Sequence, residues 1–253
     1  MTWKYLGASV IGTSHLSRST PCQDAFRLVS FGNSNEWLGL CLADGAGSAA
    51  HSDIGAQIAC EHLLRQIVNL PLDLAAFDAS IKQVFSEVRQ IVIDKSGELN
   101  VSPRELASTA LVAVLGPSCA AFAQIGDGVI VVEDETGFHT VFWPDTGEYA
   151  NATYFLTDEH FRDHIVTSTI NTGVRSAAIM SDGLQRLALD FSIRAPHPEF
   201  FRPLFQTVRN APETSLLQTP LELFLGSKQV NQRTDDDKTL AIAVRSDDDS
   251  SIS

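Results

Sequence analysis

Hydrophobic and polar residues alternate in the amino-terminal part of the chain, a pattern that is typical of β-strands with one buried face. It predicts strands near residues 4–11, 25–31 and 37–43. The turn-forming stretch GNSNE separates the second of these from the third, so we expect the two to form a hairpin.

The period then changes to that of amphipathic helices. One helical pattern covers 52–67, and a second runs from 74 to about 95 with its apolar residues on one stripe. Pro71 lies between them. Because proline lacks the backbone N–H that a helix interior needs, we expect Pro71 to separate the two helices.

Strand patterns return in the middle of the chain, at 108–115, 119–125, 128–133 and 138–143. The short sequences between them, LGPS, GDG and DETG, are rich in turn-forming residues, so a meander of antiparallel strands is predicted. Residues 145–173 are polar and have few periodic signals, and we expect them to form an irregular excursion or flap.

The carboxyl-terminal part resumes with AAIMSDGL, a predicted buried strand that ends at Ser181 and Asp182. Two helical patterns broken by NAPE occupy 196–225, and KTLAIAV forms a last strand. We therefore expect a single α+β domain over 1–245, in which helices cover antiparallel sheets. The acidic segment 246–253 is predicted to be a disordered tail.

Charge narrows the possible partners. The 253 residues include 18 Lys and Arg against 31 Asp and Glu, a formal net charge of −13. A surface that binds nucleic acid or an anionic membrane needs clustered cations. We therefore expect that neither nucleic acid nor a membrane is a partner of this protein. The excess of carboxylates is compatible with simple solubility or with a metal site.

The four cysteines have no spacing typical of a zinc site. The amino terminus lacks the pattern of a signal peptide, and no later window approaches about 18 consecutive apolar residues. A cytoplasmic protein with reduced thiols is the resulting expectation.

Several aspartates stand where strands end or begin, most of them beside glycines. They are Asp24, Asp44, Asp127, Asp182 and Asp236. An Asp-Gly pair alone is more often a turn, but the repetition of this setting suggests that the side chains converge at one edge of packed sheets. Converging carboxylates need a counter-charge. Because the ligands would all be oxygens, Mg²⁺ or Mn²⁺ is favoured over zinc.

The ordered motifs CQDAF, ADGAGSAAHSDIGA, LASTALVAVL, QIGDGVIVV, SDGL and DDDKTLAIAV resemble those of the metal-dependent type 2C protein phosphatases. The resemblance covers nearly the whole chain, and GTSH followed by PCQDA is most similar to the compact bacterial branch. It implies a four-layer α-β-β-α sandwich of two antiparallel sheets flanked by helix pairs, with a two-metal centre at one end.

The same resemblance implies roles for individual residues. Asp44 would bridge two Mn²⁺ or Mg²⁺ ions, Gly45 would offer its backbone carbonyl to one, and Asp182 and Asp236 would complete the other. Asp24 would act directly or through water. Two ions roughly 3.5–4 Å apart can lower the pKa of a bridging water and aim it at phosphorus.

The chain departs from the family at the phosphate contact. Many members have an arginine five residues before the aspartate of the first motif, where this chain has Ser19. Arg18, one residue earlier, could deliver its guanidinium to the same place. His15 is a second candidate, as phosphate contact or as general acid, while a surface or capping role for this histidine is equally compatible with the sequence.

A second departure concerns a third metal ion. Members that bind one usually have the pattern S-D-G-x-x-D, and here Arg186 occupies the last position. A cation cannot ligate a cation, which puts the third ion in doubt. Asp127 would then bind a loosely held ion or contact water, and Arg186 would pair with Asp127 or receive phosphate.

The resemblance implies a phosphatase that hydrolyses phosphoserine and phosphothreonine in proteins, with the substrates of a serine/threonine kinase as partners. A catalytically weak relative that binds phosphoproteins as a regulatory module is the alternative. Retention of Asp44, Asp182 and Asp236 favours catalysis, because a binding module has no need of three mutually repelling anions. A two-metal nuclease conflicts with the acidic charge balance.

Overall fold

The structure is a computed structural model, and it describes residues 2–70, 73–144 and 153–246. Three sequence predictions therefore lie wholly or partly outside the described residues. These are the helix break at Pro71, the first part of the excursion, 145–152, and the tail from 247 onward.

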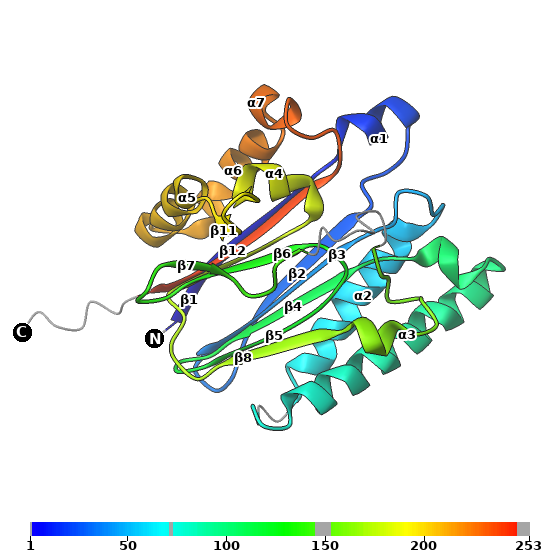
Figure 1. Cartoon of the computed structure of the whole chain (residues 1–253), viewed down its shortest axis with the longest axis horizontal. Coiled ribbons are helices and arrows are strands. Elements are labelled where there is room, and N and C mark those ends of the chain that lie inside the picture. Colours follow the sequence, from blue (N-terminus) through cyan, green and yellow to red (C-terminus); the bar gives the residue numbers. More distant parts are fainter. Residues whose placement is uncertain (1, 71–72, 145–152, 247–253) are drawn as a thin grey trace, which may run out of the picture.

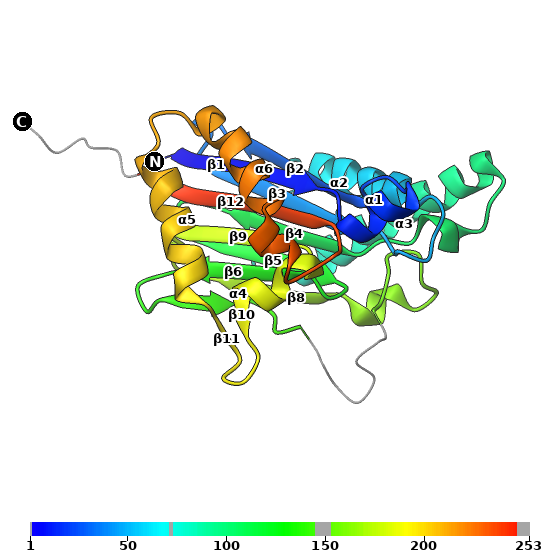
Figure 2. The ribbon, with the colours of Figure 1, turned by 90° about the horizontal axis from the view of Figure 1, so that it is seen from above.

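Two five-stranded antiparallel sheets form the centre of the fold (Figure 1). The first contains, in spatial order, β1 (Thr2–Val10), β12 (Lys238–Ser246), β9 (Ser176–Met180), β6 (Val129–Glu133) and β7 (Phe138–Thr140). The second contains β2 (Asp24–Phe31), β3 (Trp37–Asp44), β4 (Ala110–Leu115), β5 (Ala120–Ile125) and β8 (Val166–Ile170). In Figure 2, β1, β12, β9 and β6 follow one another across the first sheet.

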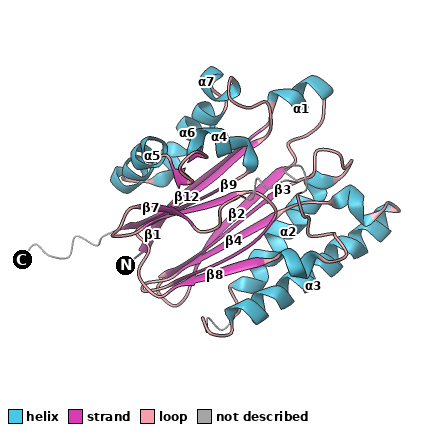
Figure 3. Cartoon of the chain, viewed as in Figure 1, coloured by secondary structure: helices cyan, strands magenta, loops and turns pink. Residues whose placement is uncertain are grey.

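Helices cover the outer face of each sheet (Figure 3). The second sheet is covered by α2 (Ser52–Ile67) and α3 (Phe77–Leu99), and the first by α5 (Pro198–Asn210) and α6 (Gln218–Leu225). Short elements join these layers: α1 (Thr13–Arg18), α4 (Gln185–Ala188), α7 (Lys228–Asn231), the 3₁₀ turns η1 (Pro103–Leu106), η2 (Phe161–His164), η3 (Asp182–Leu184) and η4 (Thr214–Leu217), and the small hairpin of β10 (Leu189–Asp190) and β11 (Ala195–Pro196).

Three apolar clusters hold the four layers together. One lies between the two sheets and includes Leu40, Phe122 and Ile179. The other two lie between each sheet and its own helices. Phe85 belongs to the cluster on the second sheet, and Phe205 belongs to the cluster on the first sheet. A helix–sheet–sheet–helix stack requires three such interfaces, so the predicted α-β-β-α sandwich is confirmed.

Most local predictions are confirmed. The first helix occupies 52–67 as predicted, and the second begins and ends a few residues later than predicted. The hairpin around GNSNE pairs β2 with β3, and its register brings Asp24 opposite Asp44. The last strand, β12, pairs with β1 and β9 in the middle of the first sheet.

The predicted meander of four strands is wrong. β4 pairs with β5 in the second sheet, whereas β6 and β7 belong to the first. The chain crosses between the sheets at the GDG sequence, where Gly126 has a φ of 101°. The buried Gln124 side chain donates to the carbonyl oxygens of Gly126 and Gly128, which satisfies the backbone of this crossing.

The expectation of irregular structure throughout 145–173 is also wrong in part. Val166–Ile170 forms β8, which pairs antiparallel with β5 at the edge of the second sheet. Its alternation was hard to recognise because an edge strand buries little of its surface, and Val166 is exposed. Leu156, Phe161 and Ile165 are nevertheless buried against α3 and the second sheet.

None of the helices within the described ranges is long and apolar enough to cross a membrane.

Candidate active site

The antiparallel pairings bring the ends of several strands to the same edge of the sandwich. β3 ends at Asp44 opposite the start of β2, and β9 ends just before Asp182, opposite the start of β12. Asp236 lies two residues before β12, and Asp127 follows β5. Aspartates that are distant in the sequence therefore meet at one end of the molecule.

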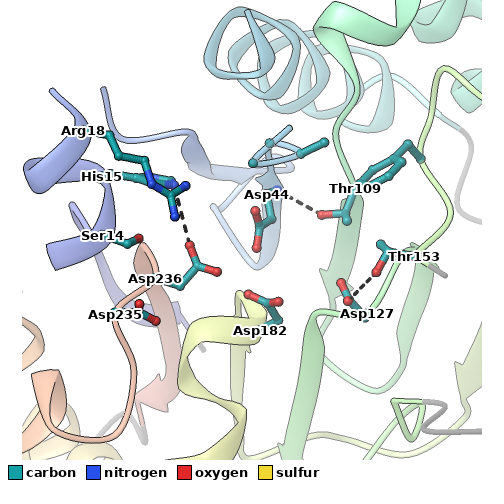
Figure 4. Close-up of a pocket in the computed structure, with 14 residues that line it drawn as sticks. Ser14, His15, Arg18, Asp44, Thr109, Asp127, Thr153, Asp182, Asp235 and Asp236 are labelled. Carbon is teal, nitrogen blue, oxygen red and sulfur yellow. Dashed lines mark hydrogen bonds and ion pairs between the residues drawn. The ribbon is translucent and has the colours of Figure 1, made fainter. Parts of the chain in front are cut away.

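A cavity of about 340 Å³ opens at this edge, and most of the predicted site residues line it (Figure 4). One wall carries the carboxylates of Asp44, Asp127, Asp182 and Asp236 with Gly45 beside them. The other side is formed by α1, which contributes Ser14, His15 and Arg18. Anions and a cation therefore face each other across the same space.

Local backbone contacts hold Asp44 and Gly45 in place. The Asp44 N–H donates to the Thr109 hydroxyl at 2.9 Å, and the Thr109 N–H donates to the Asp44 carbonyl at 2.8 Å. A side chain on Gly45 would place a Cβ 2.7 Å from the Gln23 carbonyl oxygen and 2.8 Å from Ser52 Cβ. Only glycine fits there, because the backbone at Gln23 and the first residue of α2 approach so closely.

The carboxylates raise one another's pKa values. Burial raises the pKa of Asp44 well above its usual range, and the nearby charges of Asp24 and Asp182 raise it further. Burial, with the charges of Asp127 and Asp236, raises the pKa of Asp182 to about 6. The site therefore holds more negative charge than the protein alone stabilises, which favours a bound cation.

Asp24 does not line the cavity. It lies behind Asp44, between the sheets, where Oδ2 accepts hydrogen bonds from the hydroxyls of Ser181 at 2.8 Å and Thr239 at 2.7 Å. Burial raises the pKa of Asp24 to about 7. Its other oxygen, Oδ1, is buried and has no hydrogen-bond partner within the described residues, so Oδ2 alone is tied to the first sheet.

His15 is buried, so it is neither a surface residue nor a helix cap. Its Nδ1 lies 2.9 Å from Asp237 Oδ2, although the angle is too poor for a hydrogen bond, and its Nε2 lies 3.9 Å from Asp236 Oδ1. Asp237 is itself buried and accepts backbone N–H groups from Gly12 and Gln23, both at 2.6 Å. The carboxylate of Asp237 thus ties α1 and the start of β2 to the last strand.

Arg18 is the last residue of α1 and extends into the cavity (Figure 4). Ser19, at the position where many type 2C phosphatases have arginine, adopts a left-handed conformation with φ 56° and ends the helix. The early end of α1 therefore explains how an arginine displaced by one residue still reaches the site.

Asp127 is held by a neighbouring loop rather than by an arginine. The Thr153 hydroxyl donates to Asp127 Oδ2 at 2.7 Å, and the Gln185 side chain donates to the Asp127 carbonyl at 2.6 Å. Within residues 2–70, 73–144 and 153–246, Asp127 and Arg186 form no ion pair. The pairing considered from the sequence is therefore wrong.

A family model described as protein phosphatase 2C matches residues 11–226. This match includes Asp44, Asp127 and Asp182. The chain belongs to the protein phosphatase 2C family. It is therefore a protein phosphatase, a hydrolase of phosphoric monoesters.

One relative is similar to this phosphatase in sequence, and solved structures are similar to it in fold. Serine/threonine-protein phosphatase 3 of Escherichia coli K12 is 35% identical over 250 residues, which are 96% of this chain and 99% of the relative. Stp1, a serine/threonine phosphatase from Staphylococcus aureus, shares 13% identity with a TM-score of 0.60, and the match covers 98% of this chain and 96% of Stp1. A crystal structure of a bacterial serine phosphatase matches with a TM-score of 0.67 at 13% identity. This match covers 96% of this chain and 98% of the serine phosphatase.

The donors of this phosphatase suit a hard divalent ion. Carboxylates and a backbone carbonyl provide only oxygen ligands, and Asp182 Oδ1 is buried with no hydrogen-bond partner. Among the described residues, the structure contains no group of three or more His, Cys, Asp or Glu side chains that could hold a metal ion by themselves.

Sequence reasoning missed several residues of the cavity. Thr153 and Phe155 reach it from the segment predicted to be irregular, and Ser14 reaches it from α1, which had no predicted helix. Asp237, next to Asp236 in the chain, was not among the predicted site residues. The alternation of β12, with Lys238 and Leu240 on one face, was the available sign that Asp236 and Asp237 point in different directions.

Proposed function

We propose that this protein phosphatase hydrolyses phosphoserine and phosphothreonine in proteins with a centre of two Mn²⁺ or Mg²⁺ ions. The observation that carries the proposal is a single cavity in which Asp44, Asp182 and Asp236 face Arg18 and His15. The full-length similarity to a relative named serine/threonine-protein phosphatase supports the choice of substrate residue.

In this proposal, Asp44, the Gly45 carbonyl, Asp182 and Asp236 would hold the two ions, with Asp44 as the ligand common to both. A pair of ions in such a site lowers the pKa of a water molecule and neutralises charge that develops on the phosphoryl oxygens. The protein's part is to hold these donors in a partly buried cavity, and the raised pKa values of Asp44 and Asp182 support a counter-charge there.

Arg18 and His15 would bind the phosphoryl group from the opposite side. The planar guanidinium of Arg18 suits two phosphoryl oxygens at once. His15 is held in one orientation by burial and by Asp237, so its Nε2 is available at the cavity for a contact with phosphate or for proton donation to the leaving oxygen.

Asp24 and Asp127 receive supporting roles in the proposal. Asp24 lies behind Asp44, where it fixes the strand ends and contributes negative charge, with any contact to an ion made through water. Asp127 lines the cavity, but its Oδ2 already accepts from Thr153. With Arg186 replacing the expected acid, a third ion has few ligands left.

The proposed partners are phosphorylated proteins, in particular those modified by a serine/threonine kinase. A net charge of −13 disfavours nucleic acid as substrate. A cytoplasmic location is proposed as well, because all four cysteines are free thiols.

Hydrolysis of a phosphothreonine peptide should depend on divalent metal. We expect phosphate release with Mn²⁺ or Mg²⁺ and loss of activity in EDTA, because the carboxylates alone repel an anionic substrate. Steady-state phosphate release against metal concentration measures this. A protein that binds the phosphopeptide but releases no phosphate at any metal concentration would instead be a phosphoprotein-binding module.

Replacement of Arg18 by alanine should raise KM for the same peptide by roughly tenfold or more, since a charge-assisted hydrogen bond contributes about 1.5–3 kcal/mol. The matched control is Arg65→Ala, which removes an exposed arginine on α2 that pairs with Glu61. An unchanged KM in Arg18→Ala would indicate that His15 or Arg186, and not Arg18, contacts the phosphate.

A further inference from the structure

A second, smaller cavity adjoins the catalytic one. This side cavity has a volume of about 280 Å³ and is lined by Gly183, Gln185, Arg186, Arg233 and Thr234, together with Asp182, Asp235 and Asp236. The same three aspartates also line the catalytic cavity, where Figure 4 shows them along one edge. A ligand in the active site can therefore extend into the side cavity without leaving the protein surface.

The two arginines of the side cavity come from separate elements. Arg186 lies on α4, directly after the turn that carries Asp182, and Arg233 lies between α7 and β12, three residues before Asp236. Both elements are on the helical side of the first sheet (Figure 3). The backbone at these places is fixed by Gln185, which donates to the Asp127 carbonyl, and by the Arg233 N–H, which donates to the Val230 carbonyl at 2.8 Å.

Neither guanidinium is neutralised in the part of the chain that the structure describes. Both side chains are exposed, and the ion pairs found there involve other residues. Asp182 and Asp236 are assigned to the metal ions, which leaves Asp235 as the one remaining acid of the side cavity against two arginines. In a chain with a net charge of −13, this is a local site for an anion.

We propose that the side cavity binds an anionic group of the substrate close to the phosphorylated residue. The group is a carboxylate of Asp or Glu, or a second phosphoryl group, because both present the paired oxygens that a guanidinium fork binds. An extended peptide advances about 3.3–3.6 Å per residue, so a side chain one or two residues from the phosphorylated one reaches the adjoining cavity. This inference rests on the proposed function and adds a substrate preference to it.

The test uses the whole chain with Mn²⁺ and a set of phosphothreonine peptides that differ at one position. Glutamate, glutamine or a non-hydrolysable phosphonate residue is placed in turn at each of the two positions on either side of the phosphothreonine. We expect kcat/KM for the glutamate peptide to exceed that for the glutamine peptide roughly three- to tenfold at the best position, because exposed ion pairs contribute modestly. The preference should shrink with added salt.

The double variant Arg186→Gln/Arg233→Gln should bring this ratio to about one. Arg202→Gln, which removes one exposed arginine on α5 outside both cavities, should keep the ratio of the parent. A preference for phosphonate without one for glutamate identifies a second phosphoryl group as the ligand. The inference is overturned if the parent prefers neither the glutamate nor the phosphonate peptide over the glutamine peptide at any of the four positions, or if the double variant keeps the parent's preference.

Failure of the proposed function is distinguishable from failure of this inference. If no peptide is hydrolysed, the proposed catalytic role fails. Calorimetry then measures the affinity for the glutamate peptide relative to that for the glutamine peptide, in the parent and in the double variant. If the glutamine peptide is hydrolysed and neither the glutamate nor the phosphonate peptide is preferred, only the side cavity is assigned wrongly.

Discussion

Asparagine in place of Asp44 should lower kcat for a phosphothreonine peptide by at least about a hundredfold. The amide has nearly the same shape as the carboxylate, so β3 and its hydrogen bonds with Thr109 remain. It lacks the negative charge with which Asp44 would hold the proposed metal ions, and loss of one group that stabilises transition-state charge costs roughly 10²–10³ in kcat. Steady-state kinetics with Mn²⁺ measures the loss.

Asp190→Asn is the matched control. Asp190 lies outside the catalytic cavity, where its carboxylate accepts from the N–H and hydroxyl of Ser192. This variant should retain the parent's kcat within about twofold, because surface substitutions of this kind have small effects. If Asp44→Asn were as active as the parent, the assignment of Asp44 to the metal centre would be wrong.

The second large effect concerns stability. In EDTA, the unfolding temperature should fall as the pH rises from about 4 to about 7. The pKa of Asp182 is raised to about 6 and that of Asp24 to about 7, and burial raises the pKa of Asp44 as well. The folded protein thus retains protons that the unfolded chain releases near pH 4, so the free energy of unfolding decreases through this interval.

Divalent metal should reverse this trend. An ion that binds only the folded state at a hundred times its dissociation constant adds about 2.7 kcal/mol, which corresponds to roughly 5–10 °C for a chain of this size. The gain should be larger at pH 8 than at pH 5, because the ligands must lose their protons to bind.

Thermal unfolding at pH 5, 6, 7 and 8 with EDTA or MnCl₂ measures both effects. Asp44→Asn should be more stable than the parent in EDTA at pH 7 and should gain less from Mn²⁺, since it removes a charge that burial disfavours. An unfolding temperature in EDTA that increases steadily to pH 7, or no stabilisation by Mn²⁺ at pH 8, would contradict the assignment of these carboxylates.

Much of this fold is encoded in short stretches. The helix Ser52–Ile67 was predicted in nearly its observed position because its small and apolar side chains repeat at helical spacing. The β2–β3 hairpin was predicted because two alternating segments flank a turn. Both features depend on interactions between residues that are close in the chain, which a pattern of hydrophobic and polar positions records directly.

Features that depend on distant contacts were missed or misassigned. The turn at Gly126 looks like a hairpin in the sequence, yet β6 pairs with β9 in the other sheet. The edge strand β8 buries too little surface to show a clear alternation. Asp24 has the same local setting as Asp44, and only the hydroxyls of Ser181 and Thr239 turn it away from the cavity.

The sequence by itself determined that aspartates stand at strand ends and that helices accompany antiparallel strands in an α+β domain, because strand period and strand ends are local properties. The two-sheet sandwich was implied by the resemblance to the type 2C phosphatases. Only the tertiary structure decided which side chains share a cavity. It buried His15 against Asp237, brought Arg18 to the carboxylates and placed Arg186 beside Arg233. Those neighbours lie far apart in the chain, and their meeting depends on how two sheets pack rather than on any one segment.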